Sequence, residues 1–169
     1  MKNKNYYFNF IPLYNWNIPD IKNYPGSFAS ERTSEYHTGI DIYCPPATLV
    51  YSIEPGTIVA IETFTGTKAN CPWYLETCAV LVQGKDCVYL YGEIEPNPEL
   101  KIGDKIKANH YLGFVIPVLT KDKGNGTTML HFEKYKSGTT KSVFWYKNEP
   151  QPENLLDPTS TVETILKQK

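Results

Sequence analysis

The stretch TTMLHFEKY, residues 127–135, predicts a β-strand that carries chemical groups on one of its faces. Because side chains alternate along a strand, Leu130 and Phe132 would share one face. Met129, His131 and Glu133 would share the other. A histidine and a carboxylate on the same face make His131 a candidate ligand, and the rest of the chain decides what it could bind.

The sequence on the N-terminal side of this stretch has the same character from about residue 36 onward. Short runs of β-branched and aromatic residues recur there, separated by Gly and Pro: TLVYSI, TIVAIETF, AVLVQ, CVYLYGEI and YLGFVIPVL. Aromatic residues make up 14% of the chain, and its 13 Pro and 11 Gly are spread along it, which favours a β-rich protein over a helical bundle. We therefore predict an all-β fold.

The length of 169 residues fits one domain with additions at its ends. Residues 1–35 have aromatic side chains between Asn and Pro without a period, and we expect an irregular aromatic arm packed on the core. Residues 36–135 would form the β domain. Residues 136–169 would form a C-terminal extension whose segment STVETILKQK predicts a short helix, with Ser160 and Glu163 as a capping box.

Charge and hydrophobicity exclude several classes of partner. The net charge of -1 and the pI near 6.3 give no basic surface for nucleic acid or an acidic membrane. No apolar run approaches the roughly 20 residues that cross a bilayer, so we predict no transmembrane segment. The first residues lack a continuous apolar stretch, so no signal peptide is predicted in this chain.

The four cysteines leave two interpretations open. Cys71 and Cys78 stand at the two ends of CPWYLETC and could close this loop as a disulfide in an oxidising compartment. In a reducing compartment all four would be buried thiols. No spacing is typical of a zinc site built on cysteine.

His37 and Asp41 form the second candidate cluster, in YHTGIDIYCPP. In an extended chain they would lie about 13 Å apart, too far to share one small ion, but Gly39 permits a bend between them. His131 could be the third group if its strand lies beside this segment. Two imidazoles and a carboxylate, with water in the fourth position, are a catalytic zinc arrangement, although a single histidine is more often a structural residue.

The sequence of these segments resembles that of the lysostaphin-type, or LytM-like, zinc metallopeptidases of bacterial cell walls. HTGID and LHFE carry the resemblance, and the segment KIGDKIKANHYLGFV extends it, over about 100 residues from roughly 32 to 135. It implies an antiparallel two-layer β-sheet core, the duplicated hybrid motif. It also implies one Zn²⁺ bound by His37, Asp41, His131 and a water. The implied partner is a peptide or glycan of peptidoglycan, or another peptide, and the implied location is extracytoplasmic or in the cell envelope.

Two positions depart from the family pattern. The family usually has HLHFE and YxHL, and its helper histidines would fall here on Met129 and Tyr91. A thioether is no base, and a phenol is a poor one at neutral pH. The resemblance therefore implies a zinc site whose catalysis is impaired. Glu133 could substitute as the base, as could Glu93, two residues beyond Tyr91.

Three functions stay open at this point. The first is a zinc-binding domain that recognises cell-wall peptide or glycan without efficient cleavage. A looser similarity, in DIYCPP and KDCVYLY, to vertebrate leukocyte cell-derived chemotaxin gives a precedent for keeping the ligands and losing the catalytic groups. The second is an active zinc endopeptidase with substituted acid and base residues. The third is a scaffold domain without metal.

Overall fold

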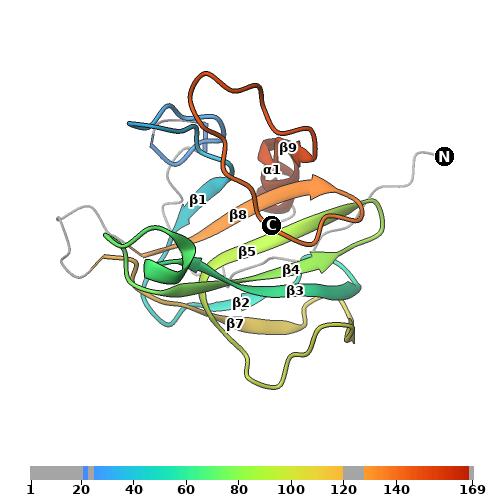
Figure 1. Ribbon diagram of the computed structural model, residues 1–169. Helices are drawn as coiled ribbons and strands as arrows, with labels where there is room; N and C mark the ends of the chain where they lie inside the picture. The colour runs from blue at the N-terminus through green and yellow to red at the C-terminus, as the bar shows by residue number, and fades with distance from the viewer. Residues whose placement is uncertain (1–20, 23–24, 120–127, 168–169) are drawn as a thin grey trace.

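The computed structural model describes residues 21–22, 25–119 and 128–167. Antiparallel strands dominate this part of the chain, and a single short helix follows them, as predicted (Figure 1). The elements are β1 Ile40–Tyr43, β2 Leu49–Tyr51, β3 Gly56–Thr65, the 3₁₀ turn η1 Thr67–Ala69, β4 Thr77–Gln83, β5 Cys87–Pro96, β6 Lys105–Ile106, β7 Tyr111–Val115, β8 Met129–Lys136, β9 Leu155–Leu156 and α1 Thr159–Lys167.

The main sheet has the strand order β1-β8-β5-β4-β3-β6, and β9 adds to β8. Strand β8, which contains the LHFE segment, therefore has β1 on one side and β5 on the other. Asp41 on β1 lies opposite His131 on β8 in the register of this pair. The expected neighbourhood of the HTGID segment and the LHFE strand is thus confirmed.

A second layer consists of β2 and β7, which lie below the main sheet in Figure 1. The long strand β5 connects the layers, since it pairs with β8 through residues 87–92 and with β7 through residues 94–96. Residue 93 lies between the part of β5 that pairs with β8 and the part that pairs with β7.

The main core fills the space between the layers and is sealed by α1. Alternate residues of β8, Leu130 and Phe132, point into it and are fully buried. A smaller cluster covers the opposite face of the main sheet, where Tyr135 of β8 packs with Leu90 and Leu155. Both faces of β8 are therefore covered, which explains why a polar site on this strand is also buried.

The C-terminal helix begins one residue before the predicted cap. The capping group is the side chain of Asp157, whose Oδ1 accepts a hydrogen bond from the Thr159 backbone N–H at 2.8 Å. Ser160 lies inside the helix, so the predicted capping box is wrong. Val162 and Ile165 anchor the helix in the main core.

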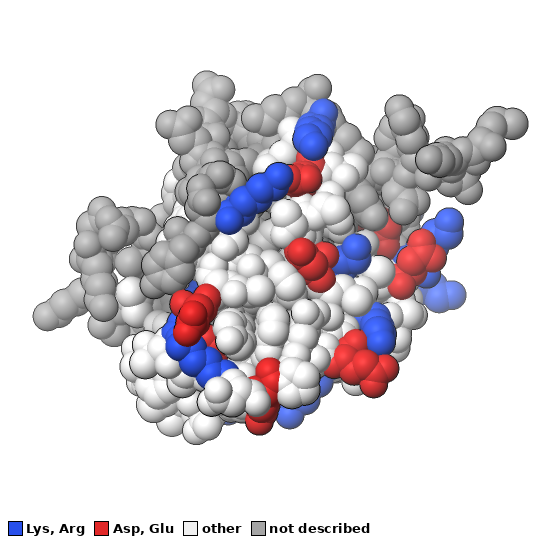
Figure 2. All heavy atoms as spheres, turned by 90° about the horizontal axis from the view of Figure 1, so that it is seen from above, with Lys and Arg blue, Asp and Glu red and all other residues white. Residues whose placement is uncertain are grey.

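The predicted N-terminal arm falls largely outside the described residues, and its boundary stays a prediction. Of its last part, Phe28 packs its ring against Trp145 from the chain that follows β8, with ring centroids 6.0 Å apart. In the described part of the chain no helix has the length and apolarity needed to cross a membrane. Figure 2 shows acidic and basic side chains interspersed on one face, without a broad patch of one sign.

Candidate metal centre

The three predicted ligands converge on one point. His37 Nε2 lies 3.1 Å from Asp41 Oδ1 and 3.2 Å from His131 Nδ1, and the last two atoms are 2.9 Å apart. All three side chains are buried. Ligand atoms around a tetrahedral zinc lie about 3.4 Å from one another, given bonds of about 2.0–2.1 Å. Small outward shifts would therefore seat the ion, and the donor set of two imidazoles and a carboxylate fits zinc.

Gly39 makes this convergence possible through its small size. A Cβ on Gly39 would lie 2.5 Å from the Phe132 carbonyl oxygen and 2.8 Å from His131 Nε2. The bend expected at this glycine does not use a positive φ angle. Its role is to let the chain between His37 and Asp41 pass directly against β8.

His37 and Asp41 are each held by a contact behind the ligand atom. The backbone carbonyl of Ser27 accepts a hydrogen bond from His37 Nδ1 at 2.8 Å, which leaves the lone pair of Nε2 for a metal. Asp41 Oδ2 accepts a hydrogen bond from Arg32 Nη2 at 3.0 Å, while Oδ1 faces the two histidines. Both supports come from the loop before His37.

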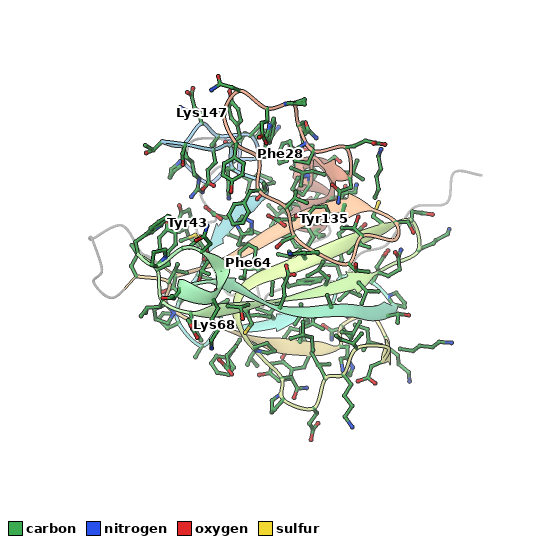
Figure 3. All side chains as sticks on the ribbon, in the orientation of Figure 1. Phe28, Tyr43, Phe64, Lys68, Tyr135 and Lys147 are labelled. Atoms are coloured by element: carbon green, nitrogen blue, oxygen red, sulfur yellow. The ribbon has the colours of Figure 1, made fainter. Side chains whose placement is uncertain are left out.

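His131 is held by Glu133 on the same strand. Its Nε2 lies 2.9 Å from Glu133 Oε1, and this carboxylate also accepts hydrogen bonds from Thr38 Oγ1 and, at 2.5 Å, from the Tyr135 hydroxyl. Figure 3 shows Tyr135 on the upper side of β8, beneath the segment that carries Phe28. Glu133 is 1% exposed and both of its oxygens are engaged, which suits orientation of His131 better than proton transfer.

The electrostatics of the cluster favour positive charge. Burial alone would raise the pKa of Asp41, but the charges and hydrogen bonds of His37 and His131 hold it well below its ordinary value. Burial would lower the pKa of His131, but its bonds to Asp41 and Glu133 outweigh burial and raise it to about 10. A site that stabilises a charged imidazolium between two carboxylates is suited to a metal cation.

With this geometry established, a family model described as peptidase family M23 matches residues 35–143. The chain belongs to peptidase family M23. LytU is similar to it in structure, with 16% identity, a TM-score of 0.51, and coverage of 83% of this chain and 88% of LytU. The catalytic domain of the antimicrobial peptidase lysostaphin from Staphylococcus simulans is also similar, with 18% identity and a TM-score of 0.50. The match covers 76% of this chain and 80% of the lysostaphin domain.

At such low sequence identity, these structural similarities show a shared fold. In the comparison with the solution structure of lysostaphin, 77% of this chain is matched, and the match spans 44% of the lysostaphin chain. No curated protein matches it in sequence. The resemblance seen in HTGID and LHFE is thus confirmed at the level of family and fold.

Tyr91 is not part of the metal centre of this M23 domain. Its ring lies in the main core at 1% exposure, and its hydroxyl oxygen accepts a hydrogen bond from the Ile53 backbone N–H at 3.0 Å. Burial raises the pKa of this phenol far above its ordinary value. Tyr91 therefore points into the core, and its assignment to the family's histidine place stays a prediction.

Glu93 of β5 follows directly after Gly92, which pairs with the candidate ligand His131. It is the extra residue of a β-bulge, because Ala79 pairs with Gly92 and the next residue of β4, Cys78, pairs with Ile94. Burial and the charge of Asp41 raise the pKa of Glu93 to about 8. A second alignment of the sequence was available. If the first residue of the family motif YxHL is matched to Tyr91, the motif lies over YGEI and its histidine position falls on Glu93.

Met129 occupies the place that strand alternation predicts, two residues before His131 on β8, half-buried and paired with Tyr43. The third histidine, His110, is away from the cluster, with its backbone bonded to Ser52. Cys71 and Cys78 are free thiols in the structure, so the loop is not closed by the disulfide considered from the sequence.

Proposed function

We propose that this chain is a zinc-dependent peptide hydrolase acting on the peptide part of the bacterial cell wall. The observation that carries the proposal is the convergence of three buried ligand atoms from His37, Asp41 and His131 within 3.2 Å of one another. When bound there, zinc would polarise a peptide carbonyl and lower the pKa of a water molecule towards 7. The protein's own part is to hold the three ligands in place through Ser27, Arg32 and Glu133.

Support for the substrate class comes from the family and from the similarity to lysostaphin and LytU. The similar lysostaphin domain is described as an antimicrobial peptidase. A peptide of peptidoglycan, such as a glycine-rich cross-bridge or a stem peptide, is therefore the proposed substrate. Because that material lies outside the cytoplasm, the proposal implies an extracytoplasmic or cell-envelope location.

A second candidate function is recognition of the same peptide or glycan without efficient cleavage. The histidine content favours it: of the 3 histidines in the chain, His37 and His131 face the metal position, and His110 lies outside this cluster, with its backbone N–H bonded to Ser52. No imidazole remains to move a proton. The loss of general acid–base help typically lowers the rate by 10²–10⁴-fold.

The test starts with the zinc content of the purified protein, measured by elemental analysis. We expect one zinc per chain in the wild type and in His110→Ala, and none in His131→Ala. Cleavage of pentaglycine and of purified peptidoglycan is then measured with and without a chelator. A zinc-loaded protein that binds these substrates without cleaving them would replace hydrolysis with the recognition function. A wild type that takes up no zinc after reconstitution would contradict both functions and favour a scaffold domain without metal.

A further inference from the structure

Glu93 lies at the corner where β5 leaves one neighbour for another. Its strand pairs with β8 up to Gly92 and with β7 from Ile94 onward. At the corner Glu93 has a φ angle of 62°, which residues other than glycine adopt uncommonly. Bulges of this kind re-aim a side chain, and they are frequent beside active sites.

The side chain of Glu93 is buried and keeps one oxygen unused. It is 9% exposed, and its Oε2 has no hydrogen-bond partner among the residues that the structure describes. Its chain neighbour Gly92 pairs with His131 in the register of β5 and β8, so Glu93 follows directly after the strand position that faces a candidate ligand. A buried polar atom of this kind calls for an explanation, because burial without a partner is unfavourable.

The other two carboxylates of the cluster are fully engaged. Asp41 offers one oxygen to the metal position and the other to Arg32. Glu133 uses one oxygen for His131 and Thr38 and the other for Tyr135. Of the carboxylates around the described ligands, Glu93 is the one with an oxygen left for a group that enters the site.

We propose that Glu93 is the catalytic base of this centre and takes the place of a helper histidine. This inference rests on the proposed hydrolysis. As the oxygen of the attacking water bonds to the peptide carbonyl carbon, one O–H bond of that water breaks and Glu93 accepts the proton. Glu93 then donates this proton to the amine nitrogen as the C–N bond breaks, and the products are one carboxylic acid and one amine.

The inference also gives the bulge a purpose. Regular alternation along β5 would put residue 93 on the same face as Tyr89 and Tyr91, which point into the main core. The extra residue lets Ile94 take that inward place instead, since Ile94 is fully buried in the main core. On this inference, the bulge turns the Glu93 side chain away from the inward face and towards the metal ligands.

The test compares Glu93→Gln, which keeps the size of the side chain and removes its ability to accept a proton, with Glu95→Gln. Glu95 lies on the same strand and is exposed, so it is a matched control. Zinc content, thermal unfolding, the binding constant for pentaglycine, and the kcat and KM for its cleavage are measured for each. We expect Glu93→Gln to lose 10²–10⁴-fold in kcat, with zinc content, KM and peptide binding close to the wild type. Glu95→Gln should match the wild type in every quantity.

Two results with Glu93→Gln would overturn the assignment. Cleavage within about threefold of the wild type would show that another group moves the proton. Loss of zinc would make Glu93 a part of the metal site and not a base, and Glu93→Asp, which keeps the charge, would then restore the zinc. A wild type that holds zinc and binds the peptide but cleaves nothing would overturn the hydrolytic function first and the base role with it.

Discussion

His131 Nε2 donates a hydrogen bond to Glu133 Oε1 over 2.9 Å, while the other ring nitrogen of His131 faces Asp41. The two residues stand on the same face of one strand, so a single β-strand supplies both the ligand and its support. Carboxylate contacts of this kind fix the tautomer of a metal-bound histidine and raise its basicity.

Replacing Glu133 with Gln should weaken zinc binding by about tenfold, the lower end of the range for such supporting residues. The amide oxygen can still accept from His131, but the negative charge is lost. The measurement is a zinc titration against a competing chelator. Glu153→Gln is the control, because Glu153 is 96% exposed and forms an ion pair with Lys136 at the surface. Equal zinc affinities for the wild type and Glu133→Gln would refute the supporting role.

Arg32→Gln should also lower zinc affinity, by 10–100-fold, because Asp41 Oδ2 loses its charged donor. The pair of Lys147 and Glu31 provides a matched control, since Lys147 has a similar exposure of 31% against 33% for Arg32. Solvent screens this pair because Glu31 is exposed, so Lys147→Gln should leave zinc binding unchanged. The same chelator competition reads out both variants, and an equal effect of the two would contradict the prediction.

Zinc should raise the thermal stability of the protein through the three-ligand site. At a free zinc concentration 100 times the dissociation constant, the gain is about 2.7 kcal/mol, which for a chain of this size raises Tm by roughly 5–10 °C. Melting curves with zinc and with a chelator measure this difference. His131→Ala should abolish it and His110→Ala should retain it. An equal response of the two variants would show that zinc binds elsewhere.

Tyr91→Phe should destabilise the fold and leave zinc binding unchanged. The variant leaves the buried N–H of Ile53 without its partner, which costs about 1–3 kcal/mol. Urea unfolding gives the loss of stability, and zinc content and peptide cleavage should stay at wild-type levels after correction for the folded fraction. A fall in turnover at unchanged stability would return Tyr91 to the active site.

Gly39→Ala should damage both the fold and the metal site. The added methyl group would lie 2.5 Å from the Phe132 carbonyl oxygen, so β1 and β8 must separate. We expect the free energy of unfolding to fall by about 1–3 kcal/mol, as at other overpacked sites, together with weaker zinc binding. Unfolding curves and zinc titration of the same preparation test the link, and normal values for both would disprove the close approach.

The strands and the ligands could be predicted from the sequence because their signals are local. Runs such as CVYLYGEI between turn residues mark strands, and the alternation around His131 marks the two faces of β8. The convergence of His37, Asp41 and His131 was implied by the resemblance of HTGID and LHFE to the zinc metallopeptidase family.

The features that the sequence did not show depend on contacts between distant segments. Glu93 could be named as a possible base, but alternation alone cannot show that β5 changes partner at that residue. Arg32 and Ser27 support their ligands through loop contacts that leave no periodic signal. Gly39 was noticed, but for its flexibility, because only the paired strands reveal that space is what it provides.

The corner at Glu93 has two consequences for the domain. The same backbone irregularity lies where β5 passes from one layer to the other, and it carries the carboxylate of the proposed catalytic base. A deletion that straightened the strand would remove the reactive group and separate the layers in one event. A substitution at residue 93 that keeps the bulge would, in contrast, change the proposed chemistry and leave the two layers joined.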